Sequence, residues 1–172
     1  KGTYIPNEEI QAYLKRVEGI PVADQQVRAV DIGSTNVAIG VVYRGKLAKP
    51  GPNTVAEHDK VSEVYHILDG TATLMVGADI VDLKPRPAND RAVRLLNGPG
   101  GNGVSIRNGV TYNLKAGDVV IIPAGVGHLY TRIDDHIRYI MVRLDPEKVA
   151  PLKDEAAAKA DLASGGGENK SR

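Results

Sequence analysis

The chain of 172 residues contains no cysteine, no phenylalanine and no tryptophan. The lack of cysteine excludes disulfides, thiolate metal sites and cysteine nucleophiles. All 7 aromatic residues are tyrosines, so a core must be built mainly from valine, isoleucine, leucine and alanine. This composition favours β-strands over helices.

The chain also lacks long apolar runs and an excess of charge of one sign. A typical apolar run, residues 119–122, is far shorter than the roughly 20 residues of a membrane-spanning helix. The net charge is +1, from 22 basic and 21 acidic residues spread along the chain. We therefore expect neither a membrane nor a nucleic acid as a partner.

The compartment is left open by the sequence. The chain starts at Lys1 rather than methionine, which is expected of a trimmed chain or of one whose targeting peptide has been removed. A cytoplasmic location and an exported, periplasmic location are the two alternatives.

The length of the chain and the distribution of β-rich and helical patterns along it predict one main domain with two flanking segments. Residues 1–26 are expected to hold a short amphipathic helix that is capped by Asn7 and ends at Gly19. Residues 27–146 are expected to form the main domain. Residues 147–172 are expected to form an Ala-rich helix near residues 154–163, followed by a flexible tail.

The main domain is predicted to be all-β. Short β-rich runs are separated by glycine or proline, and no helix-length periodic segment lies between them. An antiparallel sandwich or barrel is therefore expected rather than βαβ units. The runs are residues 27–32, 37–43, 63–68, 71–76, 119–122 and 137–144. Residues 77–109 are expected to form a long excursion, and its glycine-rich part, residues 98–103, a flexible loop.

Two segments place histidines and a carboxylate at the ends of strands. In the first, His58 precedes Glu63 by four intervening residues, and Gly70 follows at a turn. In the second, a strand from Gly117 ends in Pro-x-Gly, and His128 opens the next strand. Imidazole and carboxylate groups are common ligands of divalent metals.

These segments resemble the two motifs of the cupin superfamily, G-x5-H-x-H-x3,4-E-x6-G and G-x5-P-x-G-x2-H-x3-N. The resemblance covers roughly residues 37–144, and the second motif matches at its glycines, its proline and its histidine. It implies an antiparallel double-stranded β-helix, or jelly-roll barrel, with a short N-terminal helix and a C-terminal helical tail. A homodimer is also expected by analogy with the family.

The resemblance further implies one divalent metal ion, Fe, Zn, Mn or Ni, bound by His58, Glu63 and His128. Two positions depart from the family pattern: the first metal histidine is replaced by Ala56, and the final asparagine by Arg132. Two imidazoles and one carboxylate still leave coordination positions open for water, substrate or oxygen. The competing interpretation is a degenerate site that no longer binds metal.

Strand alternation predicts which neighbours face the barrel interior. If Glu63 points inward, so does Tyr65, whereas His66 points outward. Likewise, Tyr130 and Arg132 are expected to share the face of His128. We expect Glu63 and Tyr130 to serve in proton transfer, and Tyr65 and Arg132 to contact substrate; wall packing and a surface ion pair are the simpler alternatives.

His136 lies in a polar turn and is expected at the surface rather than in the metal site.

The leading hypothesis is a metal-dependent enzyme acting on a small organic molecule, as an oxygenase (an oxidoreductase), an isomerase or a lyase. The alternative is a non-catalytic small-molecule or sugar-binding barrel, which the missing histidine at Ala56 favours. A storage or structural role is less well supported by a single short barrel. The fold itself does not choose among these functions.

Overall fold

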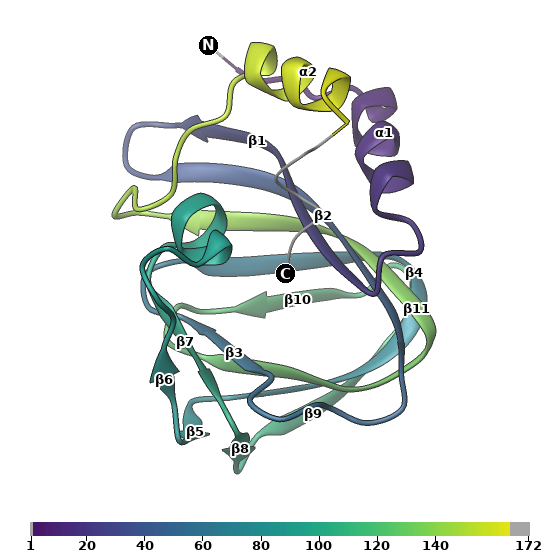
Figure 1. The fold of residues 1–172 in the computed structure, drawn as a ribbon, viewed down its shortest axis with the longest axis vertical. Coiled ribbons are helices and arrows are strands. Elements are labelled where there is room, and N and C mark those ends of the chain that lie inside the picture. Colours follow the sequence, from purple (N-terminus) through teal and green to yellow (C-terminus); the bar gives the residue numbers. More distant parts are fainter. Residues whose placement is uncertain (1, 166–172) are drawn as a thin grey trace.

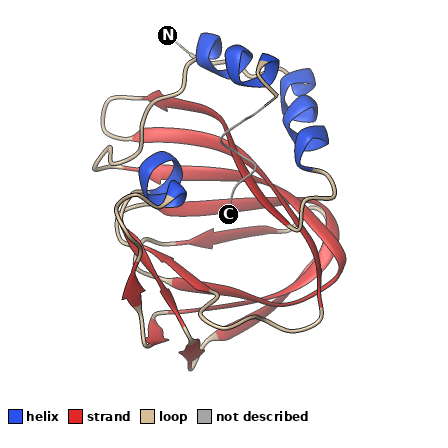
Figure 2. Ribbon diagram, viewed as in Figure 1, coloured by secondary structure: helices blue, strands red, loops and turns tan. Residues whose placement is uncertain are grey.

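The computed structural model describes residues 2–165, and the tail expected beyond residue 165 lies outside the described residues. Most of the chain is in strands, and two helices lie at one side of the strand layers (Figures 1 and 2). The elements are α1 Asn7–Val17, β1 Val22–Asp31, β2 Asn36–Leu47, β3 Val55–His58, β4 Ser62–Gly77, β5 Asp79–Val81, β6 Lys84–Pro85, a π-helical turn Val93–Asn97, β7 Gly100–Gly103, β8 Ser105–Arg107, β9 Val110–Leu114, β10 Val119–Ile122, β11 Gly127–Asp145 and α2 Glu155–Ala163.

Two antiparallel sheets share the long strands β4 and β11, which confirms the predicted all-β jelly-roll barrel. The first sheet contains β1, β2, the C-terminal half of β11, the N-terminal half of β4, and β10. The second contains β6, β7, β3 and β9 with the other halves of β11 and β4. A separate pair is formed by β5 and β8. Because the long strands pass from one sheet to the other, they close the wall of a barrel.

The bend of β4 lies at Gly70, where two separate strands were predicted. This residue has a φ of +82°, and a Cβ atom there would lie 2.0 Å from the carbonyl oxygen of His136. Glycine is therefore required both by the backbone conformation and by the approach of β11. The predicted strand at residues 137–144 is likewise the second half of β11, whose first half begins at Gly127.

The main core lies between the two sheets. It consists of inward-facing aliphatic and tyrosine side chains, among them Ile67, Leu74, Ile137, Tyr65 and Tyr139. Because the chain has no phenylalanine or tryptophan, aliphatic residues and tyrosines fill the core, as the composition predicts.

The helix α1 packs on the outer side of the first sheet, where Tyr13 and Leu14 contact Val27 and Val41. It begins at Asn7, but its N-cap is Pro6 and no side chain caps it, so the predicted cap at Asn7 is wrong.

The carboxylate of Asp161 makes several of the contacts that hold helix α2 against α1. The side chain of Asp161 accepts hydrogen bonds from Tyr13 (3.1 Å) and Arg16 (2.9 Å) and pairs with Lys153. Asp154 caps α2 by accepting a hydrogen bond from the backbone of Ala157.

The glycine-rich part of the excursion is a strand and not the flexible loop predicted. Residues 100–103 form β7, which pairs with β3 along its whole length. A Cβ atom on Gly100 would lie 2.3 Å from the carbonyl oxygen of Glu57, so the glycine permits a close approach of backbones. This pairing fixes the strand that ends in His58.

Within residues 2–165, neither helix has the length and apolar character that would be needed to cross a membrane.

Candidate metal centre

Three strand ends bring the predicted ligands together. His58 is the last residue of β3, Glu63 lies at the start of β4, and His128 lies at the start of β11. All three are buried, with relative exposures of 8%, 1% and 6%. Their donor atoms lie within 4.8 Å of one another, so the sequence correctly predicts that these side chains converge.

The spacing of the donors suits one divalent ion. The Nε2 atom of His58 lies 3.3 Å from Oε1 of Glu63, and Nε2 of His128 lies 3.6 Å from Oε2. Donors that bind a common ion at about 2.1 Å are separated by roughly 3.0 to 3.4 Å in octahedral or tetrahedral geometry. Small side-chain movements would therefore let the three groups coordinate an ion.

The two histidines differ in the hydrogen bonds that orient their rings. Metal-binding histidines usually donate their second ring N–H to a carbonyl or carboxylate. Nδ1 of His128 lies 3.4 Å from the carbonyl oxygen of Val126, at the limit of a hydrogen bond. Nδ1 of His58 is buried and has no hydrogen-bond partner among the described residues. The orientation of His128 is thus better defined than that of His58.

Glu63 is surrounded by donors from three sides. Asn97 donates to Oε1 at 2.6 Å, and the hydroxyl of Tyr65 donates to Oε2 at 2.8 Å. Nε of Arg143 lies 3.6 Å from Oε1. Burial alone raises the pKa of Glu63, but His58, His128 and Arg143 together hold this pKa well below its usual range. The carboxylate is therefore ionised, as a metal ligand must be.

Burial lowers the pKa of His128 to about 4, although the charge of Glu63 acts in the opposite direction. An unfolded imidazole takes up a proton below about pH 6.5, whereas His128 in the folded protein stays neutral until about pH 4. The unfolded state therefore binds more protons between these values, and stability is lost as the pH falls through this window. The neutral imidazole is also the form that binds metal.

We expect the metal-free protein to lose about 3 kcal/mol of unfolding free energy between pH 6.5 and pH 4 through this residue. Urea unfolding at a series of pH values measures the loss. His128→Gln should flatten the slope in this window, because glutamine does not titrate. His66→Gln, which removes an exposed histidine, is the matched control. If the unfolding free energy of His128→Gln depended on pH as steeply as that of the wild type, the pH dependence could not be assigned to His128.

Tyr65 and Tyr130 both face the interior, as strand alternation predicts, and both are buried. The ring of Tyr65 lies 6.3 Å from that of His128, in an edge-on arrangement, and its hydroxyl contacts Glu63. Burial raises the pKa of both tyrosines well above the usual range, so their hydroxyls remain protonated at neutral pH. Tyr65 is therefore the tyrosine that contacts the candidate metal ligands.

The prediction that Arg132 points inward is wrong. A β-bulge lies between Tyr130 and Arg132, where β11 advances by two residues while β4 advances by one. The extra residue reverses the alternation. The side chain of Arg132 is 68% exposed and pairs with Asp134 at 2.7 Å. Arg132 therefore lies outside the barrel, in the surface ion pair that was the simpler alternative.

The remaining histidines are distant from the centre. His66 is exposed on the outer face, as predicted. His136 contacts Asp69 and Asp135 at the bend of β11 and stacks on Tyr43.

Ala56 lies directly opposite His128 across β3 and β11, so the two residues share a face. The position that lacks the family's first histidine thus faces the candidate centre.

The sequence interpretation missed three residues of the interior: Asn97, Arg143 and Arg44. Asn97 comes from the π-helical turn, for which the sequence offers no signal. Arg143 lies opposite Glu63, and Arg44 lies opposite the core residue Ile137. Arg143 lies two residues after the buried Met141, and Arg44 lies two residues after the buried Val42. Residues two apart on a strand share a face, so this spacing was a signal that could have placed both arginines in the barrel interior.

A family model for an AraC-like ligand binding domain matches residues 100–162. This segment contains β7 to β11 and most of α2, and it includes His128 but not His58 or Glu63. No match was found among proteins of curated function.

Several solved structures are similar in fold. The DMSP lyase DddQ from Ruegeria pomeroyi DSS-3 is 19% identical, with a TM-score of 0.41 over 72% of this chain and 46% of that chain. An rmlc-like cupin family protein with a double-stranded beta-helix fold, from Methanocaldococcus jannaschii, is 15% identical, with a TM-score of 0.41 over 77% and 89%. A cupin 2 conserved barrel domain protein from Salinispora arenicola is 14% identical, with a TM-score of 0.40 over 83% of each chain. The chain spans less than half the length of the DMSP lyase, and likeness at this level carries no activity across.

Proposed function

We propose that this chain, whose barrel and two strand motifs resemble those of the cupin superfamily, binds one divalent metal ion and is an enzyme acting on a small organic molecule. The observation that supports the proposal is the convergence of His58, Glu63 and His128, three buried donors from three strands. Two imidazoles and one carboxylate suit iron, zinc, manganese or nickel. A metal bound there would act as a Lewis acid or as a binding site for substrate and dioxygen.

The residues of the chain have separate roles in this proposal. His58 and His128 bind the metal as neutral imidazoles. Glu63 binds it as a carboxylate that is kept ionised and oriented by Asn97 and Tyr65. The hydroxyl of Tyr65, which contacts Glu63 at 2.8 Å and stays protonated at neutral pH, would serve as a hydrogen-bond or proton donor at the centre. Tyr130 contacts Tyr139 and Arg44 and forms part of the wall.

Elemental analysis of protein purified without added metal tests the proposal. We expect near-stoichiometric divalent metal, which His58→Ala and Glu63→Gln should each reduce strongly. Metal-free protein together with a zinc dissociation constant weaker than about 1 mM would contradict it. The exposed His66 provides a control substitution, His66→Ala, that should retain the metal.

A non-catalytic ligand-binding barrel is the second candidate. Two observations favour it: Ala56 supplies no donor where the family pattern has a histidine, and both carboxylate oxygens of Glu63 accept hydrogen bonds from protein side chains. The matched family model also describes a ligand-binding domain. A protein that binds a small molecule or sugar in the absence of metal would support this candidate. The homodimer, the domain boundaries at residues 26 and 146, and the compartment stay predictions.

A further inference from the structure

One arginine lies inside the barrel without an acidic partner among residues 2–165. Arg44 is on β2, directly opposite Ile137 of β11, whose side chain is fully buried in the main core. Directly opposite residues of an antiparallel pair share a face, so Arg44 also faces the interior. It is half-buried, so part of its side chain remains accessible.

The contacts of Arg44 are neutral. Its guanidinium carbon lies 5.1 Å from the centre of the Tyr130 ring, and its Nε donates to the Tyr139 hydroxyl at 3.4 Å, a long hydrogen bond. No carboxylate oxygen of residues 2–165 lies within 4.0 Å of its nitrogen atoms. By contrast, the other inward-facing arginine, Arg143, pairs with Asp24 and Gln26.

A half-buried cation without an anion is unfavourable, because it loses hydration without a compensating charge. We infer that Arg44 binds the anionic group of the barrel's ligand, and that this ligand is a small organic acid with an apolar body. The inference deepens the proposed function and rests on it. It also assigns the substrate contact predicted for Arg132, which lies outside the barrel, to an arginine that lies within it.

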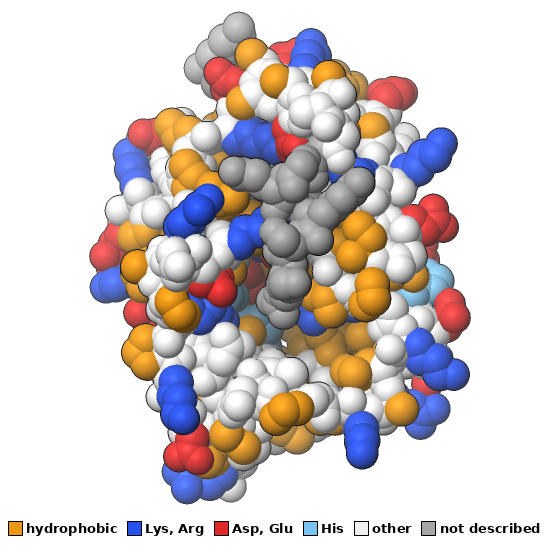
Figure 3. Space-filling view, viewed as in Figure 1, with side chains coloured by type: hydrophobic (Ala, Val, Ile, Leu, Met, Phe, Trp, Pro, Cys, Tyr) orange, Lys and Arg blue, Asp and Glu red, His pale blue; other side chains and the backbone are white. Residues whose placement is uncertain are grey.

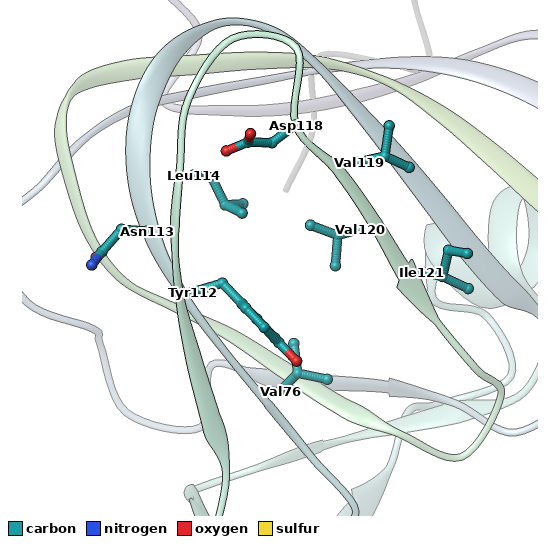
Figure 4. A pocket seen from close by; sticks show the side chains of 8 residues that line it. All are labelled: Val76, Tyr112, Asn113, Leu114, Asp118, Val119, Val120 and Ile121. Carbon is teal, nitrogen blue, oxygen red and sulfur yellow. The ribbon is translucent and has the colours of Figure 1, made fainter.

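A cavity in the barrel wall has a lining that suits the apolar body of such a ligand. The strands β9 and β10 both pair with β4 but not with each other, and the seam between them holds a cavity of about 370 Å³ (Figure 4). The space-filling view in Figure 3 shows a hollow below the middle of the visible face, with hydrophobic side chains in it. The residues that line the cavity are Val76, Tyr112, Asn113, Leu114, Asp118, Val119, Val120 and Ile121.

The inner side of this cavity adjoins the metal centre. Val76 lies directly opposite His128, and Val120 lies directly opposite Tyr65. Both valines pack against the main core, so they face inward. The acid among the lining residues, Asp118, is engaged by the backbone and side chain of Lys115. The inner lining is therefore apolar, which suits the body of the ligand rather than its charge.

A wall of tyrosine rings connects the centre to Arg44. Tyr65 lies 6.3 Å from His128 and 4.5 Å from Tyr139, ring to ring, and Tyr139 lies 6.3 Å from Tyr130. Arg44 lies over Tyr130 at the other end of this row. An acid bound along the wall would place its anionic group at Arg44 and leave another part of the molecule near the candidate metal ligands.

Calorimetric titration with hexanoate and phenylacetate, and with the neutral analogue hexan-1-ol, tests the inference on protein freed of metal. We expect the wild type to bind the acids, and Arg44→Met to weaken this binding by at least about tenfold, because a charge-assisted hydrogen bond is lost. Binding of hexan-1-ol should change little. Arg44→Lys should restore part of the affinity. Arg132→Gln, which removes an exposed arginine, should bind as the wild type does.

Thermal melting gives a second readout that a purely structural role would not produce. Without ligand, Arg44→Met should melt at or above the temperature of the wild type, since an unpaired charge is removed. Hexanoate should raise the melting temperature of the wild type and not that of the variant. If Arg44→Met does not fold, Arg44→Gln takes its place.

The inference is overturned if neither acid binds the wild type, or if Arg44→Met binds them unchanged. Zinc titration of the same proteins separates the two proposals. Zinc binding without acid binding would refute the role of Arg44 and leave the metal centre standing. Acid binding that depends on Arg44, in a protein that does not bind zinc, would refute the metal centre alone.

Discussion

Replacing His128 with alanine is expected to abolish divalent metal binding and any activity while leaving the barrel folded. Even residues that only orient a metal ligand typically contribute about 10- to 100-fold to affinity, so the loss of one of three ligands should exceed about 100-fold. The side chain lies at the start of β11, outside the main core cluster. We therefore expect the metal-free variant to lose only about 2 kcal/mol of stability, or roughly 4 to 8 °C in melting temperature.

Zinc calorimetry and circular dichroism measure the two parts of this prediction. His128→Gln provides a closer match in volume, and it should show the same loss of metal with a smaller change in stability. His136→Ala is the control histidine at the bend of the same strand, where it contacts Asp69 rather than the centre. Retained zinc affinity in His128→Ala would show that the ion is bound elsewhere. Global unfolding of both variants would show that His128 is structural.

Introducing a histidine at Ala56 is expected to increase metal affinity and to lower activity. Ala56 shares a face with His128, so a new imidazole there can become a fourth protein ligand. A further ligand should raise zinc affinity by at least about tenfold. The same imidazole would occupy a coordination position that a catalytic site keeps open for substrate or water, so turnover should fall.

Ala56→Leu separates ligation from steric blocking, since leucine fills similar space without a donor atom. We expect it to leave zinc affinity unchanged. The degenerate-site interpretation expects a different pattern, in which Ala56→His creates metal binding where the wild type has none and no activity is lost. Unchanged affinity in Ala56→His would mean that residue 56 does not reach the centre, and the argument for an open three-ligand site would fail.

The barrel and the three converging donors could be predicted because they depend on local signals. Glycine and proline mark the turns, and the spacing of His58, Glu63 and His128 follows from strand ends. The continuity of β4 through Gly70 could not be predicted in the same way. A turn glycine usually separates strands, and here it bends one strand because β11 passes directly beside it.

The errors concern features that depend on partners distant in sequence. Arg132 points outward because a bulge against β4 shifts the alternation by one residue. Residues 100–103 form a strand because β3 offers its free edge, although their composition is typical of a loop. Asn97 reaches Glu63 from a π-helical turn that no periodicity signals. Such features require the register between strands, which sequence patterns define poorly.

The distribution of the three donors over β3, β4 and β11 has a consequence for the kinetics of folding. His58 and Glu63 are close in sequence, but His128 joins them only when β11 pairs with both β3 and β4. Long-range pairing of this kind usually forms slowly. An ion that needs all three donors would then gain most of its contacts after the transition state. It would slow the opening of the barrel more than it would speed its formation, and so would lengthen the lifetime of the folded chain against proteases.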